Sequence, residues 1–333
     1  MYMNLEKVKK ILVIRLSSLG DILLTTPLLR SIKKMYPNIS IDFMLKEEYE
    51  DILLKNPNVN KLYKFAESKL EKQVLFNSII AQNYEMVIDL QNNFRTRELT
   101  GILKCPLFKL KKHHIDKFLF VYFKINKLKD APSIPVRYAN AFDIFELDNY
   151  GLDFKTDNQP KEQLQTGEKF IGMSPGARHY TKRWPKGYYT ELGKLLEADK
   201  YKVVLLGGID DQDLCDEIAK ELSNPINLCN ENDVMQTAAD MMMCKVVYCN
   251  DSGLMHLATA VNVPAIAFFG STVREFGFFP YKNKSLVMER DRLQCRPCTH
   301  IGKKRCPQKH FSCMLEITPE DAFKSLSLVV EPT

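Results

Sequence analysis

The chain has 333 residues, 45% of them hydrophobic and 26% charged, which is the balance of a soluble globular protein with room for two domains. No apolar run is long enough for a membrane-spanning helix, and the charged N-terminus with a short apolar segment interrupted by Arg15 predicts a first strand instead of a signal peptide. Nine cysteines, an odd number, favour a reducing cytoplasm.

The net charge of +6 is concentrated in the first half of the chain. Residues 1–150 hold 24 Lys and Arg against 17 Asp and Glu, whereas residues 151–333 hold 23 against 24. An anionic partner or surface would explain the excess, and so would a solvated lysine-rich face.

The first half alternates strand and helix patterns with short connections between them. Strands are expected at 10–16, 40–45, 61–65 and 86–90, and helices at 21–36, 47–55 and 70–82. Repeated β-α-β units with right-handed crossovers predict a parallel sheet that helices cover on both faces.

Residues 104–129 interrupt this alternation, because lysines are interleaved with Phe118, Phe120, Tyr122 and Phe123. An edge strand followed by a helix explains the aromatic residues slightly better. A basic and aromatic element on a membrane surface explains the lysines slightly better.

Residues 148–168 are polar and aperiodic, which predicts a linker. The alternation then restarts, with strands expected at 169–174, 203–206, 226–228, 246–249 and 265–269, and helices at 187–198, 211–222, 233–242, 253–261 and 318–330. The fold class is therefore α/β, with two doubly wound domains facing a central cleft. Open parallel sheets bind ligands beyond the carboxyl ends of their strands, so the site is expected in that cleft.

Two loops at expected strand ends of the second half have the composition of a ligand site. The first, residues 173–185, carries Arg178, Lys182 and Arg183, which suit a phosphate. In the second, Gly207 and Gly208 would let the backbone approach a ligand closely, and the acids that follow them could bind ribose hydroxyls.

A third loop, residues 249–257, is the strongest signal in the chain. A strand ends, Asn-Asp-Ser-Gly turns, and a helix begins, so the amides near Ser252 and Gly253 form an anion site at a helix N-terminus. Asp251 would also serve as an N-cap. His256 alone would be a packing residue, but beside this turn we expect it to contact the ligand.

Residues 16–21, LSSLGD, follow the first strand and end in a carboxylate, which would repel a phosphate. Asp21 could cap its helix. The loop lacks the G-x-G-x-x-G pattern, which disfavours a dinucleotide oxidoreductase.

Taken together, residues 16–21, 175–177, 182–185, 207–208 and 250–257 resemble glycosyltransferase family nine, the ADP-heptose:lipopolysaccharide heptosyltransferases. The resemblance covers essentially the whole chain. It implies the GT-B architecture of two Rossmann-like domains: an acceptor-binding domain at 1–155, a nucleotide-sugar-binding domain at 156–315, and a last helix within 316–333 that returns toward the first domain.

The resemblance also implies an activity: inverting, metal-independent transfer of a heptose from ADP-heptose to an inner-core lipopolysaccharide acceptor (lipid A–Kdo or heptose), with Asp21 as general base. The expected donor-site residues are Arg178, Lys182, Gly207, Gly208, Asp211, Asp251, Ser252, Gly253 and His256. Ser18, Gly20, Gln91, Arg95 and Arg97 are the expected acceptor-site residues.

The implied partners are the nucleotide sugar and an anionic glycolipid, with peripheral contact at the cytoplasmic face of the inner membrane. Nucleic acid is not expected. Two alternatives stay open: a GT-B transferase of another nucleotide sugar, and a non-catalytic nucleotide-sugar-binding protein, against which the presence of Asp21 argues.

Four cysteines fall within nineteen residues, at Cys295, Cys298, Cys306 and Cys313. A structural zinc site is one interpretation, since the first pair has ligand spacing. Reduced thiols or a disulfide are the others. The implied chemistry itself requires no cofactor.

Overall fold

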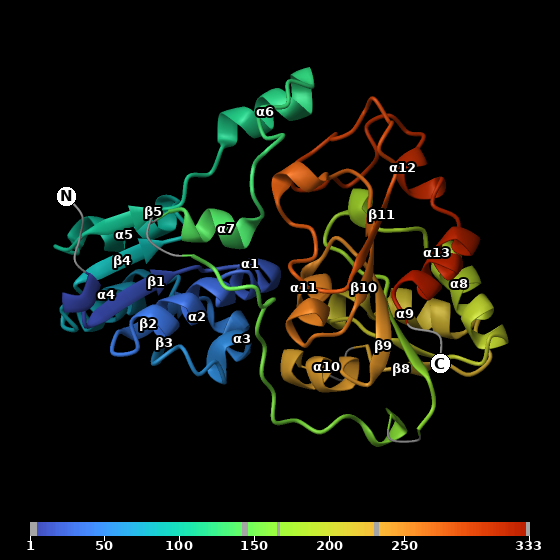
Figure 1. Cartoon of the computed structure of the whole chain (residues 1–333), viewed down its shortest axis with the longest axis horizontal. Helices are drawn as coiled ribbons and strands as arrows, with labels where there is room; N and C mark the ends of the chain where they lie inside the picture. Colours follow the sequence, from blue (N-terminus) through green and yellow to red (C-terminus); the bar gives the residue numbers. More distant parts are fainter. Residues whose placement is uncertain (1–4, 142–145, 165–166, 230–232, 331–333) are drawn as a thin grey trace. The chain divides into compact units, whose positions relative to one another are not determined.

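The computed structural model describes residues 5–141, 146–164, 167–229 and 233–330. The chain folds into two compact units (Figure 1). Unit 1 comprises Met1–Lys112 and Ile134–Phe154, and unit 2 comprises His113–Ser133 and Lys155–Thr333. Each unit is built on one parallel sheet.

Unit 1 has a five-stranded sheet in the order β3-β2-β1-β4-β5, with every pair parallel. Its strands are β1 (Lys10–Ile14), β2 (Ser40–Leu45), β3 (Lys61–Lys64), β4 (Met86–Asp89) and β5 (Leu107–Lys109). Its helices are α1 (Leu19–Leu23), α2 (Thr26–Met35), α3 (Asp51–Leu54), α4 (Lys69–Ile80), α5 (Phe94–Ile102) and α7 (Ile134–Ala139). The four strands expected from the sequence are confirmed.

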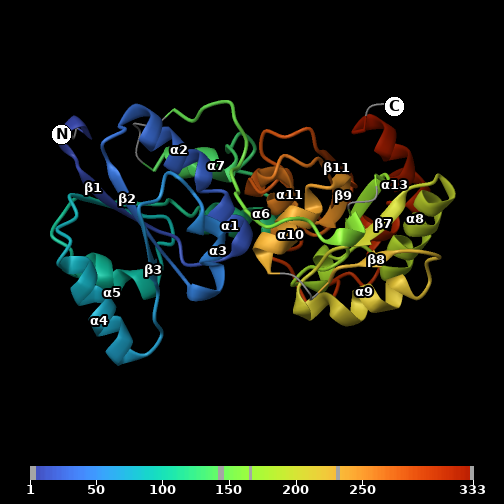
Figure 2. The same ribbon diagram turned by 90° about the horizontal axis from the view of Figure 1, so that it is seen from below.

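Helices cover both faces of this sheet, as the alternation predicts. Figure 2 shows α2 and α7 on one face and α4 and α5 on the other. Phe76 and Ile79 of α4 and Leu99 of α5 join an apolar cluster with inward residues of β1 and β4. The helix expected at 21–36 is two helices, α1 and α2, because the chain turns at Leu24 and Thr25 before Pro27 opens the second.

Unit 2 has a six-stranded parallel sheet in the order β11-β10-β9-β6-β7-β8. Its strands are β6 (Phe170–Ser174), β7 (Lys202–Leu205), β8 (Ile226–Asn227), β9 (Cys244–Asn250), β10 (Ala265–Phe269) and β11 (Leu286–Glu289). Its helices are α6 (His114–Phe123), α8 (Lys186–Ala198), α9 (Gln212–Ala219), α10 (Val234–Met241), α11 (Gly253–Ala260), α12 (Ser312–Leu315) and α13 (Pro319–Ser325). The five expected strands are confirmed, and β11 is an addition.

The core of unit 2 is centred on Trp184, whose side chain is almost fully buried. Its ring stacks on Phe268 of β10 with 4.2 Å between centroids, and its Nε1 donates to the carbonyl of Ile317 at 2.9 Å. Tyr189 of α8 meets the same indole edge-on. The tryptophan therefore anchors the loop that precedes α8 to the sheet.

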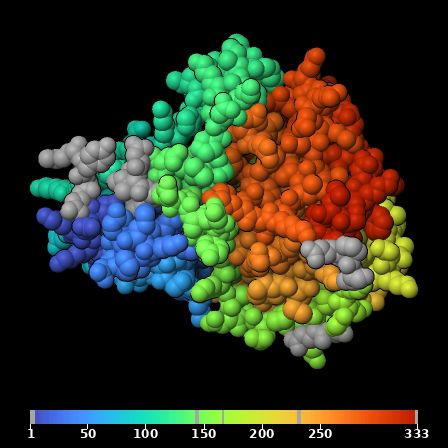
Figure 3. Space-filling model, viewed as in Figure 1, coloured from blue at the N-terminus to red at the C-terminus, as the bar shows by residue number. Residues whose placement is uncertain are grey.

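One segment of the first half belongs to unit 2. In α6, Phe120 packs edge-on against Phe276 at 6.0 Å, and Lys124 Nζ donates to the carbonyls of Cys295 and Pro297 at 3.0 and 2.7 Å. In Figure 3, α6 is the green group at the top of the view. Residues 113–133 were expected in the first domain. They pack with unit 2 instead, because apolar residues of this segment, such as Phe120, contact apolar residues of unit 2. The edge strand and helix interpretation of 104–129 is confirmed by β5 and α6.

The C-terminal helix α13 packs against α8 within unit 2. Its expected return toward the first domain stays a prediction. Within the described part of the chain, no helix is both long enough and apolar enough to span a bilayer.

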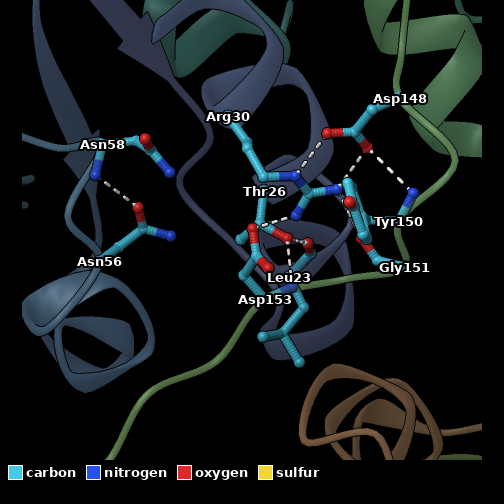
Figure 4. A network of polar contacts seen from close by, with 9 residues as sticks. All are labelled: Leu23, Thr26, Arg30, Asn56, Asn58, Asp148, Tyr150, Gly151 and Asp153. Atoms are coloured by element: carbon cyan, nitrogen blue, oxygen red, sulfur yellow. Dashed lines mark hydrogen bonds and ion pairs between the residues drawn. The ribbon is translucent and has the colours of Figure 1, made fainter. Parts of the chain in front are cut away.

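Residues 148–153 are held on unit 1 by Arg30 and its neighbours in α2 (Figure 4). Arg30 of α2 donates through Nε and Nη2 to the two carboxylate oxygens of Asp148 at 2.8 and 2.7 Å. It also donates to the carbonyl of Gly151 at 3.0 Å and pairs with Asp153. The amide of Asp153 in turn donates to Thr26 Oγ1 at 2.9 Å. This fork-to-carboxylate geometry is the strongest form of side-chain hydrogen bond.

Replacing Arg30 with Gln should lower the free energy of unfolding by about 1–3 kcal/mol, because charged hydrogen bonds to two carboxylates are lost. The hydrogen bond from Arg30 is the main cause of the lowered pKa of Asp148. A carboxylate with a lowered folded pKa stabilises the fold above its unfolded pKa and loses that contribution as the pH falls through its folded value. Urea unfolding should therefore show a loss at pH 7 that shrinks below about pH 4.

The matched control for this variant is Arg30→Lys, which keeps the charge without the planar fork and should lose less stability. Equal stability of all three proteins at pH 7 would contradict the role given to Arg30.

Candidate active site

Asp21 lies in the first turn of α1, directly beyond the carboxyl end of β1. The amide and the hydroxyl of Ser18, which is the N-cap of α1, donate to its Oδ2 at 3.3 and 3.1 Å, so Asp21 is the N3 residue of a capping box and not the N-cap that the sequence suggested. Its Oδ1 pairs with Arg15 Nη2 at 2.6 Å, and 19% of the side chain is exposed. Asp21 is thus fixed in the first helical turn and also reaches solvent as an oriented carboxylate.

Arg15 is fixed by groups other than Asp21. Its Nε donates to the carbonyl of Ser17 at 2.9 Å and its Nη1 to the carbonyl of Leu90 at 2.8 Å, and the guanidinium lies 5.8 Å from the ring centroid of Tyr138. These contacts join the ends of β1 and β4, neighbours in the sheet. The cation that meets Asp21 therefore has little freedom to move away.

This environment keeps Asp21 ionised. Burial acts to raise its pKa, but the charge of Arg15 and the hydrogen bonds from Ser18 and Arg15 outweigh burial, so the pKa is lowered overall. Tyr138 shows the opposite result, since burial is the main reason that its pKa is raised. Near neutral pH the site thus presents a carboxylate beside a neutral phenol.

The other residues expected at the acceptor site fall into two groups. Gly20 is buried within α1, and Gln91 Oε1 accepts a hydrogen bond from the amide of Leu16 at 3.0 Å, which ties the loop after β4 to the loop after β1. Arg95 and Arg97 are exposed on α5. The structure therefore joins Ser18, Gly20 and Gln91 to the surroundings of Asp21 and shows no bond from the two arginines to that carboxylate.

In unit 2, the carboxyl ends of the neighbouring strands β6 and β9 are joined by Asn250. Its side-chain nitrogen donates to the carbonyls of Pro175 and Gly176 at 2.8 and 3.2 Å, and its Oδ1 accepts from the amide of Trp184 at 2.8 Å. One buried amide thus fixes the loop after β6, which carries the expected phosphate-binding cations, to the end of β9.

Lys182 and Asp251 form an ion pair at 2.7 Å in this cluster, and Asp251 is only 6% exposed. Thr272 Oγ1, from the loop after β10, donates to the same carboxylate oxygen at 2.7 Å. The ammonium group is therefore held at the strand ends. Arg178 is exposed, while Arg183 Nε donates to the carbonyl of Ala177 at 2.6 Å and so braces the loop.

Ser252 is the N-cap of α11 and Gly253 is its first residue. The Ser252 Oγ is buried and, among the described residues, has no hydrogen-bond partner; the same holds for the hydroxyls of Ser174 and Ser271. These three serines lie at or just beyond the ends of β9, β6 and β10. Buried hydroxyls without partners carry a cost, which a bound polar ligand would remove. His256 is buried one turn further along α11.

The loop after β7 brings Asp211 against Gly176. A β-carbon at Gly176 would lie 2.1 Å from Asp211 Oδ1, so only glycine leaves room for that carboxylate. Asp211 Oδ2 accepts from the amide of Gly208 at 3.4 Å. Burial raises the pKa of Asp211, and the Gly208 amide and Arg183 offset part of that effect.

The four clustered cysteines are all free thiols, and no group of three or more His, Cys, Asp or Glu side chains that could hold a metal occurs in the described ranges. The zinc interpretation stays a prediction. Cys295 Sγ lies 3.8 Å from His310 Nε2, but the remaining thiols do not complete a ligand set around it.

Several residues of these clusters were absent from the sequence predictions. The sequence holds a signal for Arg15, because a charged residue directly after a buried strand needs a partner of opposite charge. It holds no signal for Tyr138 and Thr272, since each reaches its cluster from a distant segment. Asn250 was part of a recognised turn, but its role in joining two strand ends depends on the sheet order.

The comparisons with known proteins agree with this arrangement. A family model described as "Glycosyltransferase family 9 (heptosyltransferase)" matches residues 73–309. Lipooligosaccharide heptosyltransferase 2 of Haemophilus influenzae is 28% identical over 344 residues, which cover 95% of this chain and 98% of that protein.

Solved structures give the same result for the fold. The glycosyl transferase family 9 structure from Veillonella parvula has a TM-score of 0.80 at 22% identity and covers 99% of both chains. The ADP-heptose lps heptosyltransferase II of E. coli has a TM-score of 0.72 at 25% identity, covering 96% of this chain and 98% of that one. The expected two-domain α/β architecture, GT-B, is confirmed.

Replacing Asp211 with Asn should raise the melting temperature of the ligand-free protein by about 2 °C at pH 8. A carboxylate whose folded pKa is raised destabilises the fold as the pH rises from its unfolded pKa through its folded one, and Asn removes that penalty. The gain should therefore vanish near pH 4. Differential scanning calorimetry of this variant and of Asp210→Asn, an exposed neighbour expected to change little, checks the prediction; a gain independent of pH would contradict it.

Proposed function

Since the chain belongs to glycosyltransferase family 9, the heptosyltransferases, we propose that this glycosyltransferase moves a heptose from ADP-heptose to an inner-core lipopolysaccharide acceptor, with inversion at the anomeric carbon. The observation that carries the proposal is the near-complete alignment with heptosyltransferase 2 proteins, which covers 95% of this chain. A solved relative described as an ADP-heptose enzyme supports the choice of donor.

The cluster in unit 2 suits the donor. The N-terminus of α11, with its first amides and the buried Ser252 hydroxyl, is an anion site for a diphosphate. Lys182 stands on the neighbouring loop, held by Asp251. These groups would stabilise the negative charge that the ADP leaving group gains as its bond to the sugar breaks. Asp211, beside Gly176 and Gly208, would accept hydrogen bonds from the ribose hydroxyls.

Asp21 suits the acceptor half of the reaction. The acceptor oxygen forms its bond to the anomeric carbon while the bond to the diphosphate breaks, and the hydroxyl proton passes to the Asp21 carboxylate. Arg15 and Ser18 keep that carboxylate ionised and aimed before the acceptor arrives. The acceptor hydroxyl becomes more acidic as its oxygen bonds to the anomeric carbon, and only then does proton transfer become favourable. A carboxylate of low pKa can therefore serve as the general base.

The remaining expectations belong to the same proposal. Arg95 and Arg97, exposed on α5, would contact carboxylates or phosphates of the inner-core saccharide. The enzyme would work at the cytoplasmic face of the inner membrane, where a lipid-anchored acceptor is reached by peripheral contact. Charge stabilisation by Lys182 and a helix N-terminus supports chemistry without a cofactor.

Asp21→Asn should lower turnover of ADP-heptose and a lipid A–Kdo acceptor by about 10²–10⁴-fold, because the general base is lost. Binding of ADP, followed as the rise in melting temperature that the nucleotide produces, should stay close to that of the unmodified protein. Near-normal turnover would exclude Asp21 as the base. Absence of turnover and of ADP binding in the unmodified protein would instead contradict the proposed function.

Arg15→Gln should move the acidic limb of the kcat/KM profile to higher pH. With the guanidinium gone, the hydrogen bonds from Ser18 are left to oppose burial, so the pKa of Asp21 rises and the carboxylate is lost at a higher pH. Arg95→Gln is the comparison variant, expected to raise KM for the anionic acceptor without moving the limb. An unchanged limb in Arg15→Gln would show that the ion pair does not set the protonation of the base.

A further inference from the structure

The helix α6 has one apolar face that packs within unit 2 and another that is exposed. Phe120 and Val121 are buried in a small cluster with Leu128 and Phe276. The large side chains on the other side are exposed: Ile115 at 74%, Phe118 at 52%, Tyr122 at 65% and Phe123 at 62%. A ten-residue helix with this much exposed apolar surface is unusual unless something binds it.

These exposed side chains form a continuous patch. Phe118 and Tyr122 are one helical turn apart, with 4.9 Å between ring centroids, and Phe118 lies 5.9 Å from Phe123. Ile125, directly after the helix, is half exposed. In the space-filling view the green residues of α6 stand out at the top (Figure 3). We call this patch, formed by Ile115, Phe118, Tyr122, Phe123 and Ile125, the α6 ridge.

The loop beside this ridge is strongly basic. Residues 292–310 contain six Lys and Arg and no Asp or Glu. Lys124 anchors α6 to this loop through the carbonyls of Cys295 and Pro297. An open groove of about 770 Å³ runs between the two, lined among others by Tyr122, Lys124, Arg292, Lys303 and His310. Exposed aromatic rings thus adjoin a groove walled by cations.

Arg296, one of these six cations, is buried and donates to the carbonyls of Gly270 and Thr272. Lys304, Arg305 and Lys309 are exposed, as are Lys127 and Lys129 of the α6 segment. The nearest acid on α6, Asp116, is engaged by His113 at 3.0 Å. The surface around the ridge is therefore positive.

We propose that the α6 ridge and the 292–310 loop dock unit 2 onto an anionic lipid bilayer, with the rings of Phe118, Tyr122 and Phe123 at the headgroup level and the groove holding an anionic headgroup. Charge complementarity selects this occupant, because a row of cations without acids matches a surface of phosphates. Aromatic rings flanked by lysines suit the amphipathic boundary of a bilayer. The inference deepens the proposed function, since it specifies how an enzyme with a lipid-anchored acceptor reaches its substrate.

A short ridge of this kind gives weak and reversible attachment. Two or three partly inserted rings and several lysines near an anionic surface add up to peripheral binding, and the electrostatic part is screened by salt. Binding should therefore weaken steeply between low and high ionic strength and should be much weaker on neutral lipid.

The test is sedimentation of the full chain, without donor or acceptor, with vesicles of phosphatidylglycerol and phosphatidylcholine in equal parts and with vesicles of phosphatidylcholine alone. The unmodified protein should bind the anionic vesicles at least about tenfold more strongly. The double variant Phe118→Ser/Tyr122→Ser should lose about tenfold in binding to anionic vesicles, and so should Lys304→Gln/Arg305→Gln.

Two control variants test whether the loss of vesicle binding is specific to the ridge and the basic loop. Leu70→Ser/Val74→Ser removes two exposed apolar side chains, also one turn apart, from α4 of unit 1. Lys194→Gln/Lys220→Gln removes two exposed cations elsewhere on unit 2. Both should bind vesicles as the unmodified protein does. Thermal melts with and without ADP show whether each variant is folded.

Equal binding of the unmodified protein to both vesicle types would overturn the proposal, and so would an equal loss of vesicle binding in the test and control variants. A third contrary outcome is a ridge variant that loses self-association in sedimentation velocity but still binds vesicles, which would assign the ridge to a second copy of the chain.

Activity gives a separate readout. The ridge variants should keep turnover on a deacylated, soluble acceptor and lose it on a vesicle-embedded acceptor. Failure of turnover in every protein, with vesicle binding intact, would contradict the enzymatic function and leave the docking surface standing.

Discussion

Every strand pair in both sheets is parallel, so within each sheet all strands end at the same edge. Loops from distant parts of the chain are thereby gathered, and the functional clusters are made there. Arg15 after β1 meets Leu90 after β4, and Asn250 at the end of β9 meets the loop after β6. A hydrogen bond across two adjacent strand ends fixes each loop, and the fixed loop then orients Asp21 or Lys182. Without parallel pairing none of these partners would be neighbours.

The charged groups of the two clusters are arranged at a cost to the fold. Asp21 and Lys182 lose most of their water but gain opposite charges, in Arg15 and Asp251, which offset the loss. Asp211 gains too little favourable interaction to offset its loss of water, because burial still raises its pKa. The buried hydroxyls of Ser174, Ser252 and Ser271 carry a similar cost in the ligand-free protein. Groups left partly unsatisfied in this way are typical of sites that are completed by their substrate.

The segment around α6 connects the fold to the proposed membrane-binding surface. It follows β5 of unit 1 in sequence, yet its buried rings pack on Phe276 of unit 2 and its Lys124 binds the cysteine-bearing loop. Cys295 and Cys298 of that loop line the groove beside α6. Thus one short helix and one loop bring the aromatic residues, the lysines and part of the cysteine cluster together.

The sequence by itself determined the two α/β domains, nine of the eleven strands found in the described residues, and the loops that carry Asp21, Asp211 and Ser252. Strand and helix periodicity and turn composition are local properties. It did not determine β5 and β11 individually, the break between α1 and α2, or the unit to which α6 belongs. It also could not identify Arg15, Tyr138 and Thr272 as partners. Those features depend on which distant residues meet after the sheets assemble, and on how deeply each charge is then buried. Only the tertiary structure decides this, because burial and ion pairing are set by neighbours in space and not by neighbours in sequence.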